Sequence, residues 1–427
     1  MSTDEVGRLP LRDRVEDAVD AAGNGYRAVS GELLVTREAE GDVLQAVAEL
    51  ARVRQGRGLI RGPERVEGPG AVVRLRFAGA EELRERAAAP VAEVLEGVRA
   101  LLAGRRGDGT LRGVVSPNHL FVGEPLYSGG PADTVRLAET MPMPSAAVGE
   151  GVRVEVLDTG LFLDHPWWQR GGISAQSVEN TSEPPDDDHD GVLDQQAGHG
   201  TFVAGIVAQQ APAAQIFTRA VLDSYGHGAE DVIAQAIRDA VTAFHADSSA
   251  RRLVLNLSLG GYTDGDAPPL AILDALDTLP PEAVVVAAAG NDYPNCRRPF
   301  FPAALKRVLG VGALDEQGAP APFSNRGSWV DACARGVRVD SSFFSGFDGP
   351  LTESPDPDHF EGFAAWSGTS FAAPLVAGRI AAVLSRQLDP SELPEVRQLL
   401  RRYGHPDSGD FGVGVAATVA ELGLAIP

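Results

Sequence analysis

The strongest constraint on the fold is a regular alternation of short apolar runs with amphipathic stretches that begins near residue 152. Apolar runs typical of buried strands stand at 152–157, 215–221, 253–257, 284–288 and 308–311, and helical patterns at 200–209, 230–244, 270–279 and 370–388. Such alternation predicts an α/β fold, a mainly parallel sheet with helices on both faces. Ligands of such sheets gather at the carboxyl ends of the strands, so a functional site is expected there.

The first 125 residues follow a different pattern. Strands are expected at 31–36, 59–60, 71–77 and 113–121, and helices at 42–54 and 81–102, the second interrupted by Pro90. The order β-α-β-β-α-β predicts a small α+β, ferredoxin-like domain. A helical cap of no special role is the alternative. We therefore expect a flexible leader (1–25), this small domain (26–125), a linker (126–148) and the main domain (149–427).

Charge and composition exclude several classes of protein. The net charge of −22 argues against nucleic acid as a partner, because a phosphate backbone requires a basic surface. No apolar run reaches about 18 residues, so no membrane span is predicted. The first residues lack the pattern of a secretory signal, and a cytoplasmic location is expected. Cys296 and Cys333 are then expected to be reduced thiols, with a disulfide between them as the alternative.

Two reactive side chains stand at the ends of predicted buried elements. Asp158 ends an apolar strand in the run VEVLDTG, where a carboxylate stays partly shielded. His199 lies between two glycines at the start of an apolar helix, in the run GHGTFVAG. The glycines allow backbone or substrate to approach the ring closely. A turn-capping aspartate and a structural histidine are the alternative interpretations.

Two further segments supply a hydroxyl and an amide. Ser370 opens a helix of small residues in the run SGTSFAAP, where the helix dipole favours developing negative charge. Asn291 follows a buried strand in the run VVVAAAGN. Its amide can donate to an oxyanion, and loss of such a donor costs about 2.7–4 kcal/mol in acyl-transfer enzymes. Taken singly, Ser370 is equally typical of a helix cap, and Asn291 is more typical of a plain turn.

Together the four residues match the requirements of acyl transfer, which are a nucleophile, a base, an orienting carboxylate and an oxyanion donor. Their order, and the runs DTG, GHGTFVAGIV, NLSLGG, AAAGN and SGTSFAAPLVAG, resemble the subtilase family of serine peptidases over Val152 to about Leu424. This resemblance implies a serine endopeptidase with an acyl-enzyme intermediate. Asp158 would orient His199, which would take the proton of Ser370, and the Ser370 N–H and Asn291 would hold the oxyanion. No cofactor is required for this chemistry.

The same resemblance assigns the peptide-binding segments. The segment of Ser258, Leu259, Gly260 and Gly261 would pair with the backbone of a protein or peptide substrate. With Ala288 and Gly290, it would form the walls of the pocket for the residue before the cut. A basic or a large apolar residue fits this pattern equally well. Two departures from the family are Ala334-Arg335-Gly336, in place of the common Ala-Pro-Gly, and the segment 341–365, expected as a surface loop, either neutral or gating.

The small domain stands where subtilases often carry a propeptide. The resemblance implies that it assists folding and inhibits the enzyme, with residues 122–127 in the cleft and self-cleavage between 121 and 127. An activating partner protein is a further expectation. A catalytically silent scaffold that holds a peptide is the alternative function.

An acidic run before His199 resembles the start of a calcium loop. Asp186, Asp188, Asp190 and, further along, Asp194 are the candidate ligands, although Ala197 stands at the twelfth position, where such loops place a glutamate. A solvated acidic turn is the favoured interpretation, with calcium as the alternative.

Overall fold

The computed structural model forms two compact units. One comprises residues 1–121, 227–239 and 261–279, and the other residues 122–226, 240–260 and 280–427. The structure describes residues 10–54, 63–68, 70–106, 108–123, 133–134, 148–169, 174–178, 183, 185–189, 191, 193–348, 359–386 and 413–414. Among these residues, no helix is both long and apolar enough to cross a membrane.

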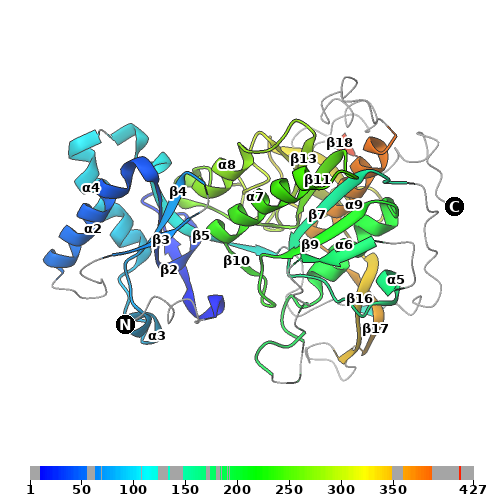
Figure 1. The fold of residues 1–427 in the computed structure, drawn as a ribbon. Helices are drawn as coiled ribbons and strands as arrows, with labels where there is room; N and C mark the ends of the chain where they lie inside the picture. Colours follow the sequence, from blue (N-terminus) through cyan, green and yellow to red (C-terminus); the bar gives the residue numbers. More distant parts are fainter. Residues whose placement is uncertain are drawn as a thin grey trace. The chain divides into compact units, whose positions relative to one another are not determined.

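The first unit contains an antiparallel sheet covered by two helices (Figure 1). Its strands are β1 (Val15–Val19), β2 (Gly25–Thr36), β3 (Glu64–Glu67), β4 (Val72–Arg76) and β5 (Val115–Gly123), and β5 also pairs with β10 (His227–Ala229). Helices α2 (Glu40–Val53) and α4 (Val91–Arg106) pack against each other, because their apolar faces share one core with β2. From β2 onward, the predicted β-α-β-β-α-β order is confirmed.

Three details of the small domain differ from expectation. Residues 11–14 form a 3₁₀ turn and β1 pairs with β2, so this part of the expected leader belongs to the sheet. The second helix is interrupted before Pro90, since α3 (Ala80–Arg84) ends and α4 begins at Val91. The strand expected at 59–60 lies outside the described residues, and the strand found in this part of the chain is β3.

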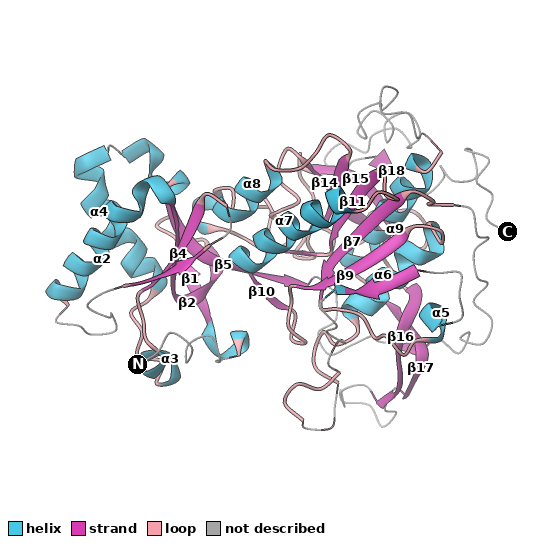
Figure 2. Ribbon diagram, viewed as in Figure 1, coloured by secondary structure: helices cyan, strands magenta, loops and turns pink. Residues whose placement is uncertain are grey.

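The second unit is built on an eight-stranded sheet with the order β18-β15-β14-β13-β11-β7-β9-β8 (Figure 2). Every neighbouring pair is parallel, which confirms the predicted α/β class. The strands are β7 (Val152–Asp158), β8 (Ser174–Ser177), β9 (Gln215–Ala220), β11 (Arg252–Leu257), β13 (Ala283–Ala288), β14 (Val308–Leu314), β15 (Val330–Arg335) and β18 (Val413–Gly414).

Two helices with little polar surface complete the core of this unit. Helix α6 (His199–Gln210) packs against α9 (Thr369–Leu384), and α9 also contacts β11, β13, β14 and β15. Small residues allow this approach: a Cβ added at Gly378 would come within 3.1 Å of the Val207 carbonyl oxygen. The shorter elements of this unit are α5 (Pro166–Gln169) and β12 (Leu259–Gly260). Helix α8 (Leu270–Leu276) belongs to the first unit, and so do residues 230–239 of α7 (Glu230–Ala246).

The expectation of a surface loop over 341–365 was wrong at both of its ends. Strands β16 (Val339–Asp348) and β17 (His359–Trp366) form an antiparallel hairpin, and β6 (Asp133–Thr134), inside the expected linker, pairs with β17. The rings that this hairpin buries completely are Phe343, Phe344 and Phe360. Their burial outweighs the acidic character of the segment, because each ring removes a large apolar area from water. Residues 349–358 lie outside the described part.

Candidate active site

The parallel sheet places Asp158 next to His199. Asp158 is the last residue of β7, and His199 is the first residue of α6. Both side chains are fully buried, and the His199 Nδ1 lies 2.7 Å from the Asp158 Oδ1. Because an ionised carboxylate only accepts hydrogen bonds, Nδ1 carries the proton and donates it to Asp158. The neutral ring then has an unprotonated Nε2 that can act as a base.

The histidine ring is held by aromatic neighbours. Its centroid lies 5.4 Å from that of Phe371 and 5.7 Å from that of Trp366. The His199 Nε2 has no hydrogen-bond partner among the described residues. The ring is thus fixed on its Nδ1 side and available on its Nε2 side.

Ser370 lies in the first turn of α9, facing the end of β11. Its hydroxyl donates to the carbonyl oxygen of Ser258 at 3.0 Å, and the Ser258 hydroxyl donates to the Ser370 carbonyl oxygen at 2.7 Å. Asn256 Nδ2 in turn donates to the Ser258 hydroxyl at 2.9 Å. These bonds fix the serine to the sheet edge. They also engage the Ser370 hydroxyl proton, which points to the Ser258 carbonyl oxygen.

Asn291 is anchored beside the same helix start. Its Oδ1 accepts the Thr369 N–H at 3.0 Å, and the Thr369 hydroxyl accepts the Gly290 N–H at 3.1 Å. An amide whose oxygen is occupied presents its NH₂ group as the donor. The backbone N–H of Ser370 belongs to the first turn of α9, and N–H groups there point out of the helix toward a ligand. The two donors predicted for an oxyanion therefore come from neighbouring points of the fold.

The structure adds a buried carboxylate that the sequence did not single out. Glu183 is 1% exposed and accepts hydrogen bonds from Thr159, Gly198 and Thr201, which flank Asp158 and His199. Burial raises the pKa of Glu183 above its ordinary value, and the hydrogen bonds from Thr159 and Thr201 act in the opposite direction. Its local sequence, SEPP, carries no signal that separates it from other acidic residues.

The predicted peptide-binding edge is occupied by an extended segment. Val122 pairs antiparallel with Gly260, and Gly123 with Leu259, all within the second unit. The Gly123 N–H donates to the Gly226 carbonyl oxygen at 3.0 Å, and Gln196 Nε2 donates to the Gly123 carbonyl oxygen at 3.1 Å. Residues 124–127, also expected in the cleft, lie outside the described residues. Gly261 directly follows β12, beyond this pairing.

A phenylalanine ring lies against glycines of both predicted pocket walls. A Cβ added at Gly260 would overlap the Phe300 ring, and one added at Gly290 would lie 3.0 Å from it. Phe300 is 1% exposed, and Ala288 at the end of β13 is fully buried. The Phe300 ring is therefore a neighbour of the predicted pocket residues that the sequence did not single out.

The segment Ala334-Arg335-Gly336, where the family commonly has Ala-Pro-Gly, contacts the residues just before Ser370. The Gly336 carbonyl oxygen accepts the Gly368 N–H at 2.8 Å, and a Cβ at Gly336 would come within 2.7 Å of the Gly368 oxygen. The Arg335 side chain is half exposed and pairs with Glu316 at 3.5 Å. The glycine is thus the residue that the close contact requires.

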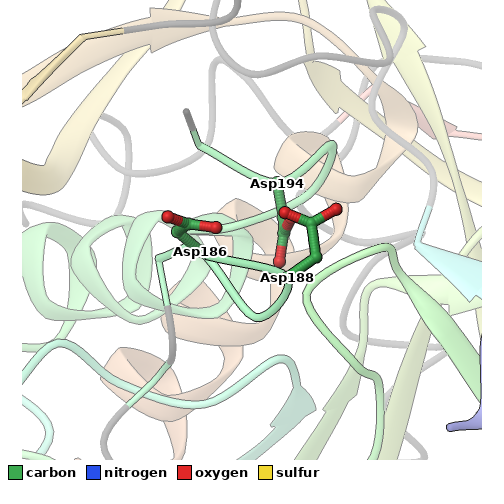
Figure 3. Close-up of side chains that lie close together, drawn as sticks. All are labelled: Asp186, Asp188 and Asp194. Atoms are coloured by element: carbon green, nitrogen blue, oxygen red, sulfur yellow. The ribbon is translucent and has the colours of Figure 1, made fainter. Parts of the chain in front are cut away.

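Three of the four aspartates predicted as calcium ligands come together (Figure 3). One carboxylate oxygen each from Asp186, Asp188 and Asp194 lie within 4.8 Å of one another. Each is already engaged by a protein donor: Asp186 by the Gly191 N–H, Asp188 by the Tyr225 hydroxyl, and Asp194 by the Ser224 hydroxyl. Asp190 lies outside the described residues.

The two cysteines are free thiols, as expected from the sequence. Cys333 is buried in β15, and burial raises the pKa of its thiol to about 12. The thiol is therefore protonated at neutral pH and takes no part in the chemistry of this site.

Comparison with known proteins assigns these features to one family. The sequence profile of the Subtilase family matches residues 149–412. The chain is 33% identical over 270 residues to a thermophilic serine proteinase of Bacillus sp. strain AK1 (61% of this chain, 58% of the relative), and 32% identical over 250 residues to subtilisin E of Bacillus subtilis strain 168 (56% of each). The matched part thus spans little more than half the length of these curated relatives.

One solved structure resembles the chain over most of its length. Fervidolysin from Fervidobacterium pennivorans, a keratinolytic enzyme related to subtilisin, matches 94% of this chain and 62% of its own, with a TM-score of 0.59 and 22% identity. At that identity the likeness concerns the fold alone. The family match over most of the main domain is the stronger finding, and the chain belongs to the subtilase family.

Proposed function

We propose that this protein is a serine endopeptidase that cleaves peptide bonds through Asp158, His199 and Ser370. The observation that carries the proposal is the buried hydrogen bond from the His199 Nδ1 to Asp158, which leaves the Nε2 as a base. The carboxylate fixes the tautomer and stabilises the imidazolium that forms when the ring takes a proton.

The reaction starts when the Ser370 hydroxyl leaves Ser258 and gives its proton to the His199 Nε2. The oxygen attacks the scissile carbonyl, and the Ser370 N–H and the Asn291 amide stabilise the negative charge on the carbonyl oxygen. The imidazolium then protonates the leaving amine, and water hydrolyses the acyl-enzyme by the same steps.

A serine-directed fluorophosphonate tests this function against the scaffold alternative. We expect the probe to label the wild type after mild proteolysis of the N-terminal domain, and to leave Ser370→Ala unlabelled. A wild type that stays unlabelled after trimming favours a silent scaffold that only holds a peptide.

We further propose that the N-terminal domain is an intramolecular inhibitor. Val122–Gly123 lies on β12 as a substrate strand would, which supports a product-like complex. Within the first unit, the domain also engages the residues that open α7. Asn118 Nδ2 donates to Asp231 at 2.9 Å, Arg74 pairs with Asp231 at 2.7 Å, and His119 lies 2.6 Å from Glu230.

Self-cleavage is tested by intact mass. We expect wild type to yield a fragment that ends between residues 121 and 127, and Ser370→Ala to stay full length. If both proteins stay full length, the proposal of self-cleavage is wrong. Activity of the untrimmed protein would argue against inhibition by the N-terminal domain and against an activating partner.

The pocket contacts favour small side chains before the cut. Because the Phe300 ring lies against Gly260 and Gly290, we propose that cleavage follows residues such as alanine or serine. Profiling on a denatured proteome tests this: Phe300→Ala is expected to shift cleavage toward large apolar residues, and an unchanged profile contradicts the assignment. The cytoplasmic location stays a prediction.

A further inference from the structure

A second carboxylate lies behind the Asp158–His199 pair. The Glu183 Oε1 accepts the Gly198 N–H at 2.8 Å and the Thr159 hydroxyl. Its Oε2 accepts the Thr201 hydroxyl at 2.6 Å and the Thr201 N–H at 3.3 Å. All four donors belong to the two motifs that carry Asp158 and His199.

Thr159 connects this carboxylate to the catalytic one. Its backbone N–H donates to the Asp158 Oδ1 at 2.8 Å, and its hydroxyl lies 3.4 Å from the same oxygen. The hydroxyl also accepts the Gly200 N–H at 2.8 Å, from the first turn of α6. The Asp158 oxygen that accepts the hydrogen bond from His199 is therefore also bonded to Thr159, and the Thr159 hydroxyl is bonded to Glu183.

Burial of Glu183 carries a cost that packing alone does not require. A carboxylate removed from water is unfavourable unless it is paired with a cation or hydrogen-bonded. Among the described residues, no cation lies within salt-bridge distance of Glu183, so hydrogen bonds are the interactions that reduce this cost. An apolar residue would fill the same space without it.

We propose that Glu183 is a positioning residue: it fixes the end of β7 against the start of α6 and thereby sets the geometry of the Asp158–His199 hydrogen bond. The inference rests on the function proposed for that pair. Glu183 does not touch the reacting atoms. It acts through Thr159 on the aspartate side and through Gly198 and Thr201 on the histidine side.

The donor pattern makes glutamate difficult to replace. Each carboxylate oxygen accepts one backbone N–H, from Gly198 or from Thr201. A glutamine in either orientation would place its NH₂ group against one of these N–H groups. Two donors would then face each other, and that N–H would have no acceptor. The kcat of Glu183→Gln is therefore expected to lie between that of the wild type and that of Glu183→Ala.

The test compares four variants of the full chain after trimming, with active enzyme counted by fluorophosphonate titration. Glu183→Ala is expected to lower kcat per titrated serine by about 10-fold or more, with KM within about two-fold, because the peptide-binding edge is untouched. Glu183→Gln should lose less. Thr159→Val should lose part of what Glu183→Ala loses, because the bonds of Glu183 to Gly198 and Thr201 remain. The variant with both changes should lose little more than Glu183→Ala, since the Thr159 contact is already absent there.

The matched control is Glu155→Gln. Glu155 is a fully buried carboxylate on β7 that pairs with Arg153 and Arg219, away from the catalytic pair. Its loss is expected to lower the melting temperature while kcat per titrated serine stays within about two-fold. An equal loss of kcat in this control would overturn the positioning role, as would a normal kcat in Glu183→Ala and Thr159→Val.

Two measurements keep the outcome interpretable. If Glu183→Ala does not fold, Thr159→Val carries the test, because it keeps the buried carboxylate. The low-field proton resonance of the His199 Nδ1–H reports on the hydrogen bond without activity, and it should shift or broaden in Thr159→Val. An unlabelled wild type removes the proposed function, whereas a labelled wild type with unchanged variants removes only the role of Glu183.

Discussion

One short segment holds acidic residues with two different fates. Glu183 lies inside the second unit, 1% exposed, with four donors that converge on it. Asp186 is half-buried and Asp188 is exposed, and their bonds from the Gly191 N–H and the Tyr225 hydroxyl lie open to solvent. Burial among converging donors, and not charge alone, therefore decides which carboxylate can hold neighbouring elements in place.

The comparison extends to the carboxylate that Glu183 supports. Asp158 is fully buried and its Oδ1 receives both the Thr159 N–H and the His199 Nδ1–H. Inside the unit, a carboxylate is thus tied to two elements at once. At the surface, water competes for every donor, and a single bond contributes little.

The largest effect is expected from Asp158→Asn. The amide lacks the negative charge that stabilises the imidazolium, and its NH₂ group can donate to the His199 Nδ1 and select the wrong tautomer; the corresponding change in another serine protease lowers kcat about 10⁴-fold. The surface counterpart Asp188→Asn should leave kcat within about two-fold, because an exposed bond contributes little. Initial rates on a small peptide substrate measure both.

Comparable losses in the two variants would break the distinction between buried and exposed carboxylates. A large loss in Asp188→Asn alone would instead move the functional centre to the acidic turn. Either result is separable from misfolding by circular dichroism of the same samples.

The comparison also marks the limit of what the sequence could predict. The sequence singles out Asp158, His199, Ser370 and Asn291 because each stands at the end or the start of a predicted apolar element within a distinctive motif. The order of strands and helices followed from the same periodicity. These features are local, so a single sequence contains them.

Glu183 and Phe300 could not be found in this way. The first lies in a polar segment without periodicity, and its donors come from residues 15 to 24 positions away. The second is one of two adjacent phenylalanines, and only the tertiary fold places its ring against Gly260 and Gly290. The hairpin within 341–365 is equally hard to predict, because its phenylalanines stand among acidic residues that are typical of a surface loop.

The stability of the protein should depend on pH through Glu183. Since burial raises the pKa of Glu183 above 4.5, the folded protein binds a proton that the unfolded chain has lost in the window just above that pH. The Glu183 contribution to the free energy of unfolding is therefore largest below about pH 4.5 and falls as the pH rises through the window. Glu183→Gln lacks this dependence, because an amide does not titrate.

Urea denaturation measures this contribution in the Ser370→Ala background, which prevents self-digestion. The protein with Glu183 intact and its Glu183→Gln counterpart are unfolded side by side at a series of pH values. The stability of the glutamate form relative to the glutamine form should decrease with rising pH. A difference that is flat or that increases would show that the hydrogen bonds to Glu183 outweigh its burial.

A smaller effect is expected within the acidic turn itself. Asp194 is 5% exposed and its Oδ2 accepts the Asp187 N–H at 2.7 Å and the Ser224 hydroxyl, so it resembles Glu183 more than its neighbours do. Asp194→Ala should lower the free energy of unfolding by about 1 kcal/mol, because the Asp187 N–H and the Ser224 hydroxyl lose their acceptor. Asp186→Ala should stay within about 0.5 kcal/mol. Urea denaturation measures both changes. Equal losses of stability would contradict the expectation that the loss increases with the burial of the carboxylate.

The smallest effect is expected from calcium. Asp186, Asp188 and Asp194 already accept protein donors, and Ala197 stands where a calcium loop would place its bidentate glutamate. A site with a dissociation constant near 1 mM would add only about 0.4 kcal/mol at about 1 mM calcium, a shift in melting temperature of about 1–2 °C. Thermal unfolding of Ser370→Ala with calcium or with chelator measures this.

A loss above about 5 °C on chelation would contradict that expectation, since it corresponds to well over 1 kcal/mol in a chain of this size. It would mean that a metal ties the acidic turn together from several sides, as the protein's own donors tie Glu183. Glu183 and the acidic turn would then both be firmly held, the first by protein donors and the second by a metal ion.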